Sequence, residues 1–101
     1  MEQSKIDAIE SNFHKLEDIK NSCESLIQKI GHLQVDLFNH PNAKLEKFLG
    51  KINGALSGSH GEIVEVTSEY ETEIYMPAKG METFNSAQDE LEENENAESN
   101  K

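Results

Sequence analysis

The sequence has no tryptophan, no arginine and a single cysteine, and each shortage excludes a kind of contact or structure. Without arginine, the chain lacks the side chain that usually makes two-pronged contacts to phosphate or guanine. The missing tryptophan and an apolar fraction of 35% imply a thin core for a chain of 101 residues. One cysteine cannot form a disulfide within its own chain. We interpret Cys23 as a small buried side chain in a reducing compartment.

Long apolar runs are also missing. No stretch approaches the roughly 18–20 apolar residues that a membrane-spanning helix needs, and the N-terminus lacks a basic start followed by an apolar segment. We therefore expect no membrane contact, no signal peptide and a cytoplasmic location. Lysine without arginine, with abundant asparagine, isoleucine and glutamate, is typical of A+T-rich coding sequences. This favours a bacterial, phage or viral source, and a phage or viral protein would work in the host cytoplasm.

Charge is divided unevenly along the chain, whose formal net charge is −11. Residues 1–61 hold seven lysines and eight acidic residues, whereas residues 62–101 hold two lysines and twelve acidic residues. We predict two domains on this basis, a helical association module over 1–61 and an acidic segment over 62–101. Such a segment is typical of interaction tails and fits a basic protein partner. Direct nucleic-acid binding is disfavoured, because no basic patch is present to replace the counterions of phosphates.

The strongest pattern is a series of apolar residues three or four positions apart. Its mean step of about 3.4 residues is close to the 3.5 that keeps one stripe facing a partner helix. The pattern predicts one long helix from about Ser4 to Phe38, ended by the approach to Pro41. We name these positions the association seam: Ile6, Ile9, Phe13, Leu16, Ile19, Cys23, Leu26, Ile30, Leu33 and Leu37.

A second apolar stripe predicts a shorter helix that begins at Pro41 and fades into a loop over residues 57–61. The short connection makes the two helices antiparallel neighbours, in a helical hairpin of the coiled-coil type. The first helix would span roughly 52 Å and the second roughly 23 Å, so the second covers only part of the seam. Another copy of the chain, a partner helix or the C-terminal segment must cover the rest, and we expect a homo-oligomer.

Residues 62–76 alternate between carboxylates on one face and β-branched or neutral side chains on the other. This two-residue period favours a β-strand or hairpin, although several of the apolar residues also have helical spacing. Pro77 is expected to end the segment. An acidic, partly disordered tail is expected from residue 92 onward. A short helix over 81–92 would place on one side Met81, Phe84, Ala87 and Leu91.

The predicted strand supplies the predicted partner-binding surface. Residues 63–69, IVEVTSE, resemble the short apolar-plus-acidic motif by which peptides add a strand to the small modifier SUMO. The resemblance implies recognition in which backbone hydrogen bonds supply affinity and the flanking carboxylates meet a basic rim. The residues expected to bind a protein partner are Glu65, Val66, Glu69, Tyr70, Glu71 and Glu73.

No arrangement in the sequence is typical of an active site or a metal site. None of the four histidines is three or four residues from another or from Cys23, as a shared metal site on a helix would favour. The chain also lacks a nucleophile elbow and a phosphate-binding loop. The glutamates of residues 62–76 are expected to be exposed, where carboxylates are unsuited to acid catalysis at neutral pH. We predict a non-enzymatic protein without cofactor or metal.

These features together favour a small acidic adaptor, regulator or inhibitor that oligomerises through the association seam and engages a basic protein. One alternative is a nucleic-acid mimic of phage or viral type, whose carboxylates would imitate phosphates on a DNA-binding protein. Salt-sensitive competition with DNA would identify it. The other alternative is a coiled-coil structural or assembly component, for which we expect a large and fixed stoichiometry.

Overall fold

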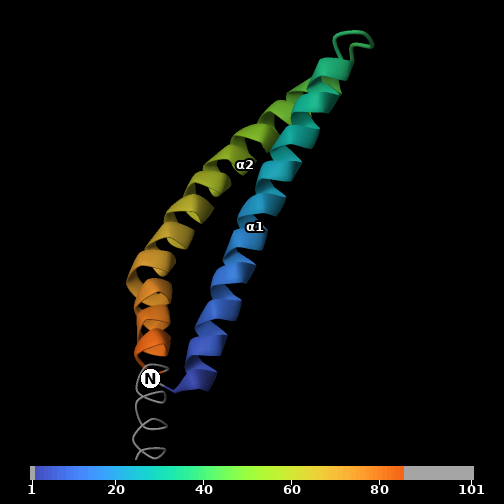
Figure 1. Cartoon of the computed structure of the whole chain (residues 1–101). Helices are drawn as coiled ribbons and strands as arrows, with labels where there is room; N and C mark the ends of the chain where they lie inside the picture. The colour runs from blue at the N-terminus through green and yellow to red at the C-terminus, as the bar shows by residue number, and fades with distance from the viewer. Residues whose placement is uncertain (1, 86–101) are drawn as a thin grey trace, which may run out of the picture. The chain divides into compact units, whose positions relative to one another are not determined.

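The computed structural model describes residues 2–85, and nearly all of these are helical. Helix α1 runs over Gln3–Asp36 and helix α2 over Ala43–Tyr70 (Figure 1). A π-helix, η1, follows directly over Glu71–Tyr75, and residues 76–85 are again α-helical. No strand occurs among residues 2–85. The chain is therefore mainly α, as the sequence predicts.

The chain divides into two compact units, which we describe separately. Unit 1 consists of Met1–Phe13 and Glu69–Lys101, and unit 2 of His14–Ser68. The boundary expected after residue 61 falls inside unit 2. Within unit 2, α1 and α2 lie side by side and run in opposite directions (Figure 1). The thiol of Cys23 on α1 faces the Leu56 carbonyl oxygen on α2 at 3.7 Å. Unit 2 is thus the helical hairpin that the sequence predicts.

The start of α2 is set by an asparagine cap. The Oδ1 atom of Asn42 accepts a hydrogen bond from the Leu45 backbone N–H at 3.0 Å. This contact satisfies one of the N–H groups that have no partner within the first turn of a helix. Pro41 stands before the cap, in the connection, so the predicted start of the helix at Pro41 is wrong by two residues.

The predicted loop over residues 57–61 is wrong, because α2 passes through it without interruption. A contact to α1 supports this glycine-rich stretch: His60 Nε2 lies 3.0 Å from Glu24 Oε1. A lone glycine in a helix costs about 1 kcal/mol relative to alanine. Packing within a hairpin outweighs such a penalty, and here it extends α2 far beyond its expected end.

The predicted strand over residues 62–76 is also wrong, because these residues belong to α2, η1 and the helix that follows. Thr67, one of the residues that favoured a strand, is 5% exposed. Its hydroxyl donates to the Ile63 carbonyl oxygen at 2.6 Å, so its polar group is satisfied inside the helix. Strand addition, as the SUMO-binding resemblance implied, has no counterpart in this helical segment.

Pro77 does not end the helix either. A proline inside a regular α-helix clashes with the carbonyl group four residues earlier. Directly before Pro77 the chain forms η1, where the Met76 N–H donates to the Glu71 carbonyl oxygen five residues earlier. We attribute the wider turn to this clash. The tail from residue 92 and most of the predicted helix over 81–92 lie outside the described residues; residues 81–85 are helical.

The core of unit 1 joins the first turns of α1 to the segment after α2. Ile6, Ile9 and Ala78 are buried together, and Tyr70 and Tyr75 pack against them. The Phe13 and Tyr75 rings stack with centroids 4.2 Å apart and an interplanar angle of 18°. In a regular helix, residue 74 would follow Tyr70 on the packed face. The extra residue of η1 brings Tyr75 there instead, and Ile74 is left 41% exposed.

Candidate protein-association surface

The association seam divides into two sets of residues in the structure. Seven of its members are buried or half-buried, whereas Ile19, Leu26 and Leu33 are 51%, 49% and 39% exposed. From Ile6 to Leu37, one series of covered positions alternates strictly between steps of three and four residues, while Glu10, Glu17 and Gly31 are half-buried outside this series. This alternation also includes three half-buried residues that the mean spacing did not single out, Lys20, Ile27 and Gln34.

The three exposed members of the seam form a stripe of their own on α1. Ile19, Leu26 and Leu33 are spaced by seven residues, and each comes one residue before a half-buried position of the alternating series. In heptad terms the covered residues occupy a and d, and the exposed ones occupy g, on one edge of the contact. An apolar stripe that includes g as well as a and d is wider than a two-helix contact needs.

Helix α2 carries a matching stripe. Phe48, Ala55 and Val66 are exposed, and each comes one residue before a covered position. Phe48 is 57% exposed and Val66 48%, whereas the adjacent Leu49 and Thr67 are both 5% exposed. These three residues therefore occupy the same g edge on α2 that Ile19, Leu26 and Leu33 occupy on α1.

The two stripes lie on the same side of the hairpin. When two helices pack in opposite directions, the g edge of one lies beside the g edge of the other, and the e edges meet on the far side. Glu24, one residue after Cys23, lies on the e edge and contacts His60 across that polar side. The opposite side is apolar, and we name it the apolar flank: Ile19, Leu26, Leu33, Phe48, Ala55 and Val66.

An open hollow lies at the Phe48 end of the apolar flank. Its lining includes the apolar side chains of Leu45 and Phe48, together with Asn42. Three lysines, Lys44, Lys47 and Lys51, complete the lining. The hollow therefore suits an apolar side chain with carboxylates beside it.

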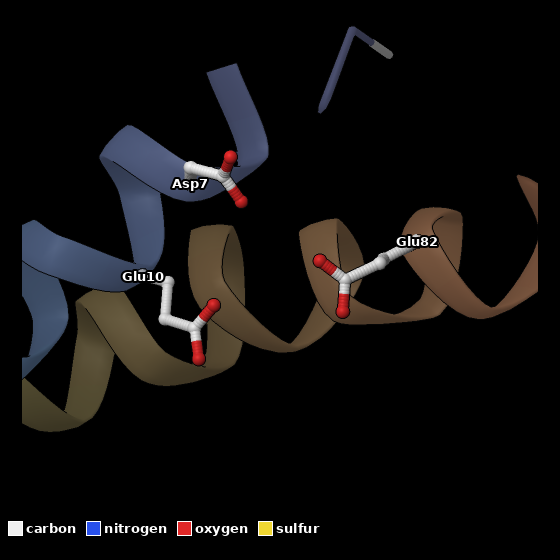
Figure 2. A group of neighbouring side chains, drawn as sticks. All are labelled: Asp7, Glu10 and Glu82. Carbon is white, nitrogen blue, oxygen red and sulfur yellow. The ribbon is translucent and has the colours of Figure 1, made fainter. Parts of the chain in front are cut away.

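Unit 1 contains a separate group of three carboxylates, Asp7, Glu10 and Glu82, with oxygens within 4.8 Å of one another (Figure 2). Two donors are already placed among them. The Gln3 amide donates to Asp7 at 2.9 Å and to Glu82 at 2.8 Å. The Lys79 ammonium lies 2.7 Å from Glu82 and 3.5 Å from Glu10. These contacts tie the first turns of α1 to residues 79–82, which gives the group a structural role.

The same contacts shift two pKa values. The hydrogen bond with Glu82 is the largest cause that raises the pKa of Lys79 above 10.5. The hydrogen bond from Lys79, followed by that from Gln3, lowers the pKa of Glu82 below 4.5. A carboxyl group with a lowered folded-state pKa stabilises the fold above its unfolded pKa. That contribution is lost as the pH falls through the folded pKa of Glu82.

Replacing Glu82 by Gln should make the stability of unit 1 depend less on pH in the acid range. The melting temperature of the parent should fall as the pH drops below 4.5, and part of this fall should disappear in the variant, which has no carboxylate to protonate. The control is Glu73→Gln, which removes the same charge from an exposed side chain. Thermal melts followed by circular dichroism across acid pH measure this. Parallel curves for parent and Glu82→Gln would contradict the assignment.

The residues predicted to bind a partner are divided between the two units. Glu65 and Val66 are exposed in unit 2, whereas Glu69, Tyr70, Glu71 and Glu73 belong to unit 1. Tyr70 is half-buried against the core of unit 1, and the three glutamates beside it are exposed. Only Val66 of this set belongs to the apolar flank.

No family model matches the chain, and the searches of curated proteins and of solved structures give no match. None of the described helices is long and apolar enough to cross a membrane. The geometry of the chain itself therefore carries the functional argument.

Proposed function

We propose that this chain is a non-enzymatic protein-association module that self-associates through the apolar flank of unit 2. The observation that carries the proposal is the exposure of large apolar side chains from two helices on one side of the hairpin. Their exposed fractions range from 39% for Leu33 to 57% for Phe48. Clustered apolar side chains of this kind mark interaction sites more often than scattered ones do.

The energetics favour a moderate, concentration-dependent association. Complete burial of a Leu, Ile, Val or Phe side chain stabilises by about 1.5–3 kcal/mol, so a half-exposed one gains about 1 kcal/mol. Two copies contribute ten such side chains, or about 10 kcal/mol, against an association cost of about 4–15 kcal/mol. The two quantities are similar. Removing one or two of these side chains should therefore be enough to shift the balance toward the monomer.

The proposal includes a second contact, to a basic protein, through unit 1. Its described residues carry two lysines and seven carboxylates, among which Glu69, Glu71 and Glu73 are exposed. Such a surface attracts a basic partner at low ionic strength and loses it as salt is added. If DNA competes for that partner, the nucleic-acid mimic is the better description. If it does not, an adaptor or regulator is.

The combined substitutions Leu26→Asp and Leu33→Asp should convert the oligomer to monomer. Both side chains lie on the apolar flank, where a carboxylate would lose its hydration on association without gaining a partner. The folding cost should be small, because both side chains are already 39–49% exposed. Light scattering after size exclusion measures the mass, and circular dichroism checks that the helices remain.

The matched control is Ser25→Asp with His32→Asp, which adds the same charge on the outer face of α1. Each control position directly precedes a flank position and is exposed. This control should keep the mass of the parent. Equal masses for the parent and the Leu26→Asp, Leu33→Asp variant would rule out the apolar flank as the association surface.

A further inference from the structure

We infer that the apolar flank is covered by a second copy of the chain, docked antiparallel along α2 about a two-fold axis. This inference rests on the proposed function and gives it a geometry. In a two-fold contact the same surface appears on both sides, so it must complement itself. The exposed edge of α2 meets that condition in charge, in shape and in the spacing of its residues.

The charges of α2 in unit 2 are ordered along the helix. Lys44, Lys47 and Lys51 lie in its first third, and Glu62 and Glu65 lie near the end of the unit. Lys51 and Glu62 are equally far from a centre between Leu56 and Ser57. The distances of Lys47 and Glu65 from this centre differ by only one residue. Glu46 is acidic although it lies among these lysines. It follows Leu45 by one residue, however, and so lies on the polar e edge.

Reversing one copy about that centre brings opposite charges together. Lys51 of each copy then faces Glu62 of the other, and Lys47 faces Glu65. A parallel arrangement would place lysine against lysine and glutamate against glutamate. Exposed ion pairs add little affinity, but the repulsion between like charges excludes the wrong register. The charges thus select the antiparallel dimer, and the apolar flank supplies the attraction.

The hollow at Phe48 is also suited to bind α2 of a second copy. Its lining combines the apolar Leu45 and Phe48 with three lysines. The antiparallel docking brings Val66 of the second copy to this hollow, with Glu62 and Glu65 within one turn of it on the same helix. Val66 is 48% exposed, so it is available for this contact. The α2 segment around Val66 therefore supplies an apolar side chain with carboxylates beside it, which is what the hollow suits.

Small side chains lie at the centre of the proposed contact. Ala55 and Gly58 are equally far from the two-fold axis, and a Cβ atom built on Gly58 would meet no atom within 4 Å beyond its chain neighbours and the backbone of its own helical turns. Two helices can therefore approach closely there. Unit 2 is also nearly neutral, with six lysines against seven carboxylates, although the whole chain carries −11. Two copies can thus meet through unit 2 without strong repulsion.

Charge reversal in the intact chain tests the inference. One variant carries Lys47→Glu and Lys51→Glu, the other Glu62→Lys and Glu65→Lys. Each alone places like charges along the whole edge and should be monomeric at low ionic strength, with half the parental mass. An equal mixture of the two restores every opposite pair and should return to the dimer mass. Lysine and glutamate both favour helix, so circular dichroism should show unchanged helicity.

Two outcomes would overturn the inference in distinguishable ways. If both charge variants keep the parental mass while Leu26→Asp with Leu33→Asp dissociates, self-association stands and the antiparallel α2 contact is wrong. If the parent is a monomer at every concentration, the proposed self-association fails as well, and the flank belongs to a different protein.

A disulfide experiment separates antiparallel from parallel docking. In a Cys23→Ser background, a chain with Lys51→Cys should form disulfides with a chain carrying Glu62→Cys, and neither should cross-link efficiently with itself. Non-reducing electrophoresis of each chain alone and of the mixture shows which pairs form. Efficient cross-linking of either chain with itself, without the mixed species, would overturn the antiparallel arrangement.

Discussion

Replacing Gly50, Gly54 and Gly61 together by alanine should stabilise the protein by about 3 kcal/mol. Each glycine lies inside α2, and glycine costs about 1 kcal/mol relative to alanine in a helix interior. A Cβ atom at each position would meet no atom within 4 Å beyond its chain neighbours and the backbone of its own helical turns. All three are exposed, and none belongs to the apolar flank or to the covered face. Chemical denaturation at one fixed protein concentration measures the change.

The single substitutions provide an internal control. Gly50 lies in a part of α2 that the sequence already predicts as helix, whereas Gly61 lies in the stretch expected to be a loop. Gly50→Ala and Gly61→Ala should stabilise by similar amounts if α2 is continuous. A gain at Gly50 with a neutral or unfavourable effect at Gly61 would show that the helix ends before residue 61. Gly58 is left unchanged because it lies at the proposed two-fold contact.

Deleting Ala8 should disrupt the packing of unit 1, whereas deleting Thr72 should preserve that packing and cost only the return of Pro77 to a regular helical turn. Ala8 lies between Ile6 and Ile9, and its loss would turn Ile6 by about 100° around α1, away from the core. Ile6 is 0% exposed, and losing a buried side chain of this size costs about 2–5 kcal/mol. Removing Thr72 shortens the π-helix by one residue, so that Tyr75 follows Tyr70 at a normal four-residue step.

Residue-resolved hydrogen exchange distinguishes the two deletions. The Ala8 deletion should lower the protection of residues 70–82, and the Thr72 deletion should preserve it along with the stacking of Phe13 on Tyr75. Both deleted residues are exposed, so neither removes a buried contact directly. Equal losses of protection would mean that η1 is required for packing, contrary to its assignment as a local adjustment before Pro77.

The sequence predicted α1 well for a physical reason. Its apolar residues keep helical spacing over more than thirty residues, and no proline interrupts them. The same regularity could not separate the covered face from the flank. Leu26 and Ile27 are adjacent and equally apolar, so the mean spacing alone could not decide which of them faces α2. Only strict alternation of three- and four-residue steps, continued from Ile6, selects Ile27.

The second half of the described chain was predicted poorly because local preferences there oppose the tertiary structure. Val64, Val66 and Thr67 favour strands by their branched side chains, and the glycines before them favour a loop. Packing of α2 against α1 within unit 2 outweighs both preferences, with Thr67 covered and His60 in contact with Glu24. The sequence therefore predicted only part of the candidate surface. Its α1 stripe was included in the seam, whereas Phe48 and Ala55 become part of it only once the hairpin aligns the two helices.

The absolute mass of the intact chain in solution, measured by light scattering over a range of concentrations and salt, tests the central claim most directly. We predict a concentration-dependent dimer of the 11.4-kDa chain that persists at high salt, because apolar burial supplies most of the attraction. A monomer at every concentration would contradict self-association through the apolar flank.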